Sequence, residues 1–125
     1  MNGRPSIPPG LTAELLLDVF DLPVSFHRCL VPITGGVTAA LMLSQAIWTS
    51  EALDPEVGGW FCRSQEEWTE ETGLSRWEQE TARRALRSGG FLEARRAGMP
   101  AKLWFRVRPE AVGRALQAHA NPVRR

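Results

Sequence analysis

Two matching serine–glutamate motifs constrain the fold of this chain more than any other feature. They are Ser64 with Glu67 and Ser75 with Glu78. In such a capping box, the serine oxygen accepts a hydrogen bond from the third backbone N–H of a helix, and the glutamate accepts one from the serine N–H. Gly73 lies between the motifs and can end the first helix. The spacing therefore predicts helices over 65–72 and 76–88, joined by a tight turn.

Further elements are expected on both sides of this helix pair. Glycines and prolines separate the apolar stretches and mark the loops between them, and Pro109 suits the first position of a helix. We expect a long core helix over 38–53, a short extended segment over 60–63, two strands over 91–96 and 102–108 that form a hairpin, and a final helix over 109–119.

The N-terminal part of the chain has a different composition. Residues 1–10 contain three prolines and two glycines and are expected to be a flexible arm. Residues 11–36 are expected to form a helical extension, with a short helix over 13–20 capped by Thr12 and a short helix or irregular segment over 24–34. The main domain then covers 37–120, and 121–125 form a tail.

This order of elements resembles the winged helix-turn-helix family of DNA-binding proteins, over about the last two-thirds of the chain. The segment GLSRWEQETARRALRSGGFLEARR resembles the family's recognition helix running into the first strand of the wing. Together with FHRCLVPITGGVTAALMLSQAIW, it is similar to small winged-helix proteins and replication-protein N-terminal domains of bacterial plasmids and phages. The resemblance implies an α+β fold, mainly helical with a small β-hairpin and extra N-terminal helical segments.

Charge is distributed unevenly along the chain. Residues 1–62 carry two basic and six acidic side chains, a net charge of −4, whereas residues 63–125 carry thirteen and eight, a net charge of +5. Residues 76–108 alone carry nine basic and three acidic side chains, a net charge of +6. A polyanion would bind there. Because 14 of the 15 basic residues are arginine, as codon bias of a GC-rich genome would also produce, their positions matter more than their number.

The helix over 76–88 is predicted to present an arginine face. At about 100° per residue, the side chains within about 80° of Arg76 are Gln79, Glu80, Arg83, Arg84 and Arg87. The opposite arc holds Trp77, Thr81, Ala82, Ala85 and Leu86. In the family this helix enters the major groove, where arginines bind guanine edges or phosphates and Gln79 would read adenine. The alternative is a solvated face stabilised by pairs between Glu80 and Arg83 or Arg84.

The other predicted DNA contacts are to the sugar-phosphate backbone. Arg95, Arg96 and Lys102 flank the hairpin loop, where the resemblance implies contacts that position the protein on DNA. They would equally protect an exposed edge strand from pairing with another chain. Ser75 and the first amides of its helix are placed for a phosphate, because helix N-termini favour anions.

The helix over 65–72 argues against DNA, because its four carboxylates would repel phosphates unless they face away or pair with arginines. They are Glu66, Glu67, Glu70 and Glu71. We therefore weigh three functions. The first is a double-stranded DNA-binding transcriptional regulator or replication accessory of a plasmid or phage, which would act by occupying its site or by recruiting a replication or transcription protein. It would form a homodimer through its N-terminal segments. The second is a winged-helix adaptor that binds protein and not DNA. The third is a replication-initiator fragment that needs another subunit.

The remaining side chains predict no chemistry. Trp48, Trp68 and Trp77 are expected to face inward and Trp104 to be half-buried; Cys29 and Cys62 are expected to be buried, reduced thiols. His27 and Cys29 lack the second pair that a zinc site needs. No catalytic motif is recognisable, so we expect no enzyme activity, cofactor or metal. Without an apolar run long enough to span a bilayer or a signal peptide, we expect a cytoplasmic protein.

Overall fold

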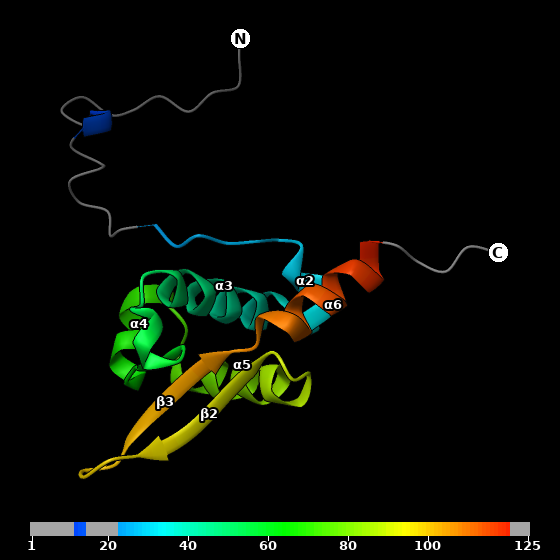
Figure 1. Ribbon diagram of the computed structural model, residues 1–125. Coiled ribbons are helices and arrows are strands. Elements are labelled where there is room, and N and C mark those ends of the chain that lie inside the picture. The colour runs from blue at the N-terminus through cyan, green and yellow to red at the C-terminus, as the bar shows by residue number, and fades with distance from the viewer. Residues whose placement is uncertain (1–11, 15–22, 121–125) are drawn as a thin grey trace.

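Helices are interspersed along the chain with three strands that form one small sheet (Figure 1). The computed structural model describes residues 12–14 and 23–120. Its elements are α2 (Leu30–Thr34), α3 (Val37–Glu51), a 3-10 turn (Pro55–Val57), β1 (Trp60–Cys62), α4 (Gln65–Thr72), α5 (Arg76–Ser88), β2 (Leu92–Ala97), β3 (Lys102–Val107) and α6 (Pro109–Ala120). The predicted α+β class is confirmed, and so are the helices expected over 65–72 and 76–88.

Helix α3 forms the centre of the core. Gly35, with φ of 90°, ends α2 in the left-handed region and lets the chain turn into α3. Most of α3 is apolar, and the fully buried side chains include Ala40, Met42 and Leu43. The predicted inward face was partly wrong, because Trp48 is 57% exposed. A helix that is apolar nearly all round has a weak periodicity, so the sequence pattern does not fix which side faces the core.

The sheet has three antiparallel strands in the order β1-β3-β2. The sequence predicts the β2–β3 hairpin, and β1, expected only as an extended segment, adds a third strand to it. Phe61 of β1 lies opposite Phe105 of β3, which lies opposite Ala94 of β2. Trp68 of α4 meets the Phe105 ring edge-on, with centroids 5.3 Å apart. The face of the sheet that carries these residues therefore packs against the helices.

The hairpin projects beyond the helices, with its turn at the far end from α6 (Figure 1). At its base, the Arg108 N–H donates to the Phe91 carbonyl over 2.8 Å, so α6 starts directly beside β2. Val112 of α6 is buried. This arrangement places α5, the base of the hairpin and the first turns of α6 next to one another.

The N-terminal part of the described chain packs on α3. Leu30 of α2 is 2% exposed, and the His27 N–H donates to the Ser44 hydroxyl over 3.0 Å. The predicted arm over 1–10 and tail over 121–125 lie outside the described residues. The helix predicted over 13–20 lies there largely as well, with residues 13 and 14 helical.

Two further expectations about burial were wrong. Trp77 is 70% exposed, because its position on α5 points away from the core. Cys29 is exposed in the turn before α2, whereas Cys62 in β1 is half-buried; both thiols are free. Trp68 is buried and Trp104 is half-buried, as expected.

Candidate nucleic-acid interface

Both capping boxes form as the sequence predicts, and they orient α4 and α5. The Ser64 hydroxyl accepts from the Glu67 N–H over 3.1 Å, and the Ser75 hydroxyl accepts from the Glu78 N–H over 3.2 Å. Each glutamate accepts from its serine N–H over 2.9 Å. Gly73, with φ of 78°, makes the turn between the helices. Ser75 is exposed, but its hydroxyl and its N–H both form hydrogen bonds within this capping box. A phosphate bound at Ser75 would have to compete with these two bonds.

Gln79 does not face outward, so the prediction that it reads a base was wrong. The side chain is 1% exposed. Its Nε2 donates to the Leu74 carbonyl over 3.0 Å, to the Gln65 carbonyl over 3.1 Å and to the Thr69 hydroxyl over 3.0 Å. One amide thus holds the start of α5 against α4 and the turn. A helical projection places this polar residue on the outside, but its hydrogen bonds to α4 and the turn hold it inside the fold.

The exposed side of α5 is rotated from the predicted one by about a quarter turn. The buried side chains are Gln79, Ala82 and Leu86. The exposed ones are Arg76, Trp77, Thr81, Arg84, Arg87 and Ser88. Three of the predicted arginines are therefore available to a partner, and Arg83 is half-buried on the flank. The helical projection places Trp77 and Thr81 on the arc opposite the arginines. Ala82 and Leu86 are buried on the other side of the helix, which shows that Trp77 and Thr81 face solvent.

The hairpin arginines lie on opposite faces of β2. Arg96 shares the inner face with Leu92 and Ala94, whereas Arg95 shares the outer face with Glu93. The Arg95 guanidinium lies 4.7 Å from the centre of the Trp60 ring. Lys102 is exposed at the start of β3. Of the predicted backbone contacts, only Arg96 is therefore on the side of the sheet that faces α5.

Positive charge accumulates between α5 and the inner face of the hairpin. The pKa of Arg83 is lowered, first by burial and then by the nearby charges of Arg87, Arg96 and Arg84, with Glu80 acting in the opposite sense. Glu80 also pairs with Arg76, with Nε and Oε1 3.6 Å apart. Among the described residues, Arg83, Arg84, Arg87 and Arg96 form no ion pair. We call these four residues the basic cluster.

The acidic side chains of α4 are partly neutralised. Glu71 pairs with Arg63, whose Nε lies 2.8 Å from Oε2, and its Oε1 accepts from Gln45 Nε2 over 2.9 Å. Hydrogen bonds from Ser64 lower the pKa of Glu67, and Lys102 contributes to this. A lowered pKa keeps the Glu67 carboxylate charged, and Glu67 is exposed like Glu66 and Glu70. Among the described residues, Glu71 is the one α4 glutamate in an ion pair, so the objection that four carboxylates would repel DNA is reduced to the other three.

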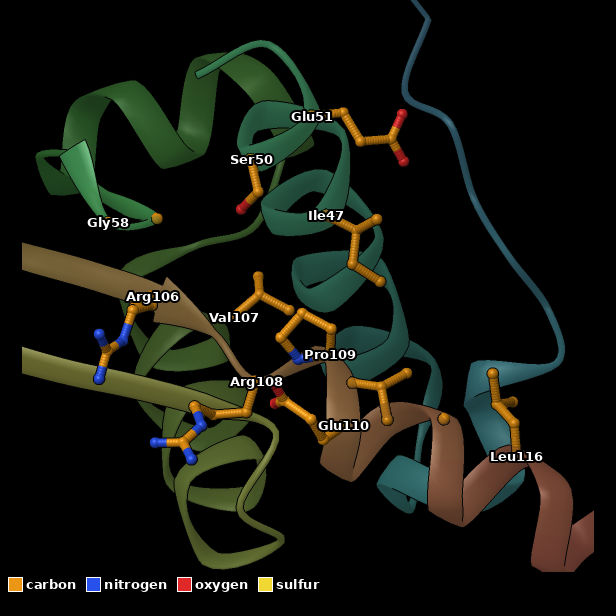
Figure 2. Close-up of a pocket in the computed structure, with 13 residues that line it drawn as sticks. Ile47, Ser50, Glu51, Gly58, Arg106, Val107, Arg108, Pro109, Glu110 and Leu116 are labelled. Carbon is orange, nitrogen blue, oxygen red and sulfur yellow. The ribbon is translucent and has the colours of Figure 1, made fainter. Parts of the chain in front are cut away.

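A cleft with a volume of about 790 Å³ lies elsewhere, between α3, the end of β3 and α6. Figure 2 shows Ile47, Val107 and Pro109 around it, while the guanidinium groups of Arg106 and Arg108 extend away on one side of the sheet. Its lining contains no nucleophile–histidine pair. Among the residues that the structure describes, no group of three or more His, Cys, Asp or Glu side chains is placed to hold a metal ion.

In the described part of the chain, none of the helices has both the length and the hydropathy needed to traverse a lipid bilayer. Comparisons of the sequence with protein-family models, and of the chain with curated proteins and with solved structures, found no match. What the protein does must therefore be inferred from its own residues.

Proposed function

We propose that this protein binds double-stranded DNA as a winged helix-turn-helix domain, and acts as a transcriptional regulator or replication accessory of a plasmid or phage. The order of α3, β1, α4, α5, β2 and β3 supports the fold, with α4, the turn and α5 as the helix-turn-helix and the β2–β3 hairpin as the wing. In this family the second helix of the pair enters the major groove.

The observation that carries the proposal is the basic cluster. Bringing four guanidinium groups together without paired carboxylates costs stability through like-charge repulsion. A phosphate backbone removes that cost by supplying the missing negative charge, and binding then releases the counterions condensed on DNA. Two of the four, Arg84 and Arg87, are exposed on α5.

The shape of α5 suits a groove. Its 13 residues span about 20 Å, and a helix with its side chains is about 10–12 Å across, close to the 12 Å width of the major groove. Arg76 and Arg84 would bind guanine edges or phosphates, while the exposed Trp77 and Thr81 would contact thymine methyl groups. Arg96 on the wing would contact the backbone and position the domain.

Salt-dependent binding to a labelled random-sequence duplex, measured by fluorescence anisotropy, tests the proposal. We expect affinity to fall as salt rises, with a logarithmic slope near −0.9 for each phosphate neutralised. Arg84→Glu should raise the Kd at least tenfold. Arg28→Glu is the matched control, because Arg28 is an exposed arginine before α2, outside the proposed interface.

The alternative is a winged-helix adaptor that binds protein. The exposed Trp48 favours it, since it lines a cleft with Glu70, Glu71 and Val24, away from α5. An adaptor would tolerate Arg84→Glu. Absence of duplex binding by folded protein at low salt would reject the DNA proposal and favour this one.

A further inference from the structure

A second cleft is lined by residues at the base of the hairpin. This is the end of the hairpin away from its turn (Figure 1). It has a volume of about 690 Å³, within the range of small-molecule sites. Three elements meet there: the C-terminal end of α5 with Gly89 and Gly90, the first residues of β2, and the first turns of α6. Trp60 of β1 completes the lining from across the sheet.

The charge of this cleft is positive. Four arginines and two glutamates line it, namely Arg87, Arg95, Arg108, Arg114, Glu93 and Glu110. Glu93 is already engaged: its Oε1 accepts from Arg106 Nη2 and from Arg108 Nη1, each over 2.8 Å. Among the described residues, Arg87, Arg95 and Arg114 form no ion pair. Glu110 also forms no ion pair among the described residues, so three unpaired guanidinium groups share the cleft with one unpaired carboxylate, and the excess of positive charge is open to an added anion.

The cleft is also held in place. The Arg95 and Arg106 guanidinium groups each lie 4.7 Å from the Trp60 ring centre, and Arg106 is fixed further by Glu93. At Gly89, a Cβ would come within 2.5 Å of the Phe91 ring, so the wall there tolerates only glycine. Glu110, Ala111 and Arg114, in the first turns of α6, line the same space. A preorganised site loses less entropy when a ligand binds.

We propose that this cleft binds a small phosphate-bearing molecule through Arg87, Arg95 and Arg114. Guanidinium groups bind phosphate with paired, charge-assisted hydrogen bonds. The cleft is recessed, and Glu93 and Glu110 would repel the neighbouring phosphates of a continuous DNA strand, which favours a compact ligand. Arg87 also belongs to the basic cluster. If the proposed DNA binding holds, ligand binding therefore weakens it by withdrawing this arginine.

Inorganic pyrophosphate is the probe for calorimetric titration of the full chain at low ionic strength. We expect saturable binding to one site. Arg114→Glu, an exposed position on α6, should weaken it about tenfold or more. Arg84→Glu makes the same change in net charge outside the cleft and should leave the affinity within about twofold. Equal losses in the two variants would mean that pyrophosphate follows net charge alone, and would overturn the proposal, as would absence of saturable binding.

A duplex-binding arm separates this proposal from the DNA proposal. Arg114→Glu should bind the duplex like wild type, and pyrophosphate should displace duplex from wild type but not from this variant, beyond a sodium chloride control of equal ionic strength. If Arg114→Glu weakens duplex binding while pyrophosphate fails to bind, the cleft serves the DNA backbone and the small-molecule proposal is wrong. Pyrophosphate binding that depends on Arg114, without any duplex binding, would reject only the DNA function.

Discussion

At the scale of single residues, the amide of Gln79 has the largest structural role of any polar group described here. It donates to three acceptors on α4 and the following turn, and it is almost fully buried. A buried acceptor that loses its donor costs more than an exposed one, because water does not replace the bond. The relative orientation of α4 and α5 therefore depends strongly on this one side chain.

We expect Gln79→Ala to lower the free energy of unfolding by about 2–3 kcal/mol, because two carbonyls and a hydroxyl each lose one hydrogen bond and a cavity forms. The Leu74 carbonyl keeps its bond from the Thr69 hydroxyl. Urea denaturation followed by circular dichroism measures this. Gln117→Ala is the matched control: Gln117 is exposed on α6, and its loss should change the free energy by less than about 0.5 kcal/mol. Equal effects of the two substitutions would contradict the role given to Gln79.

Glu93 makes the stability of the hairpin base depend on pH. Hydrogen bonds from Arg108 and Arg106 hold the pKa of Glu93 below its ordinary value of 4.5. The ion pairs of Glu93 with Arg106 and Arg108 therefore stabilise the folded chain above about pH 4.5. This contribution is lost as the pH falls through the lowered pKa of Glu93.

Glu93→Gln should thus lower the free energy of unfolding at pH 7 by roughly 0.5–1 kcal/mol, the range for partly exposed pairs. The difference from wild type should shrink as the pH falls from about 4.5 through the lowered pKa of the Glu93 carboxyl, where the folded wild-type chain takes up the proton. Urea unfolding at pH 7 and pH 3.5 compares the two, with Glu51→Gln as an exposed control. A difference that stays constant with pH would show that the ion pair is not its source.

At the scale of elements, the two sides of α5 have different roles. Its core side fixes the helix in the fold, and its outer side carries Trp77, Thr81 and Arg84. The Trp77 side chain is 70% exposed, so it adds a large apolar surface that a partner could cover on this side of α5. Under the proposed function, that partner is the floor of the major groove.

Trp77→Ala should weaken duplex binding about tenfold, corresponding to the loss of roughly 1.4 kcal/mol of apolar contact, without lowering stability. Trp48→Ala removes a similarly exposed tryptophan on α3 and serves as the control. Anisotropy titrations of a labelled duplex measure the Kd of both variants. Loss of affinity in Trp48→Ala, but not in Trp77→Ala, would place the interface on the other side of the molecule.

The elements themselves were largely predictable, because their signals are local. The capping boxes and Gly73 set the bounds of α4 and α5, and Pro109 set the start of α6. The outward side of α5 was not predictable from the same signals. Gln79 is buried with its Nε2 hydrogen-bonded and its Oε1 without a partner among the described residues, whereas Trp77 lies outside. The rule that polar residues face water therefore chooses the wrong rotation of the helix.

The sequence predicts that arginines gather on the hairpin, but not which of them lies on the side of the sheet that faces α5. Alternation along β2 implies that Arg95 and Arg96 face opposite sides of the sheet, but sequence alone does not say which side faces α5. That depends on the register with β3 and on the pairing of β1, a contact between segments more than 40 residues apart. The cleft at the hairpin base has the same origin, since it joins residues from β1, α5, β2 and α6.

At the scale of the whole molecule, the surface available for self-association is smaller than the sequence indicates. Helix α2 was expected to contribute to a dimer, yet its Leu30 and Thr34 are buried within the chain. Among the described residues near it, Phe26 and Val37 are the large apolar side chains left exposed, at 42% and 62%. Any dimer through this end must use them or residues outside the described ranges.

We expect sedimentation velocity at micromolar concentration to show a homodimer of the full chain, in keeping with the two-fold sites usual for such domains. The substitution Val37→Glu should shift it toward monomer, because a charge buried in an apolar contact is costly. Val57→Glu is the control, at another exposed valine. A monomer both with and without duplex would reject the dimer.

The division of α5 into a buried and an exposed side also bears on how such a chain can change over generations. Substitutions at Trp77, Thr81 and Arg84 alter what the helix meets without disturbing Gln79, Ala82 or Leu86, which hold it in place. A library randomised at the three outer positions should therefore yield folded proteins, and under the proposed function these proteins should differ in the DNA sequences they prefer. The outer side of α5 can change in this way while its inner side keeps the helix in place.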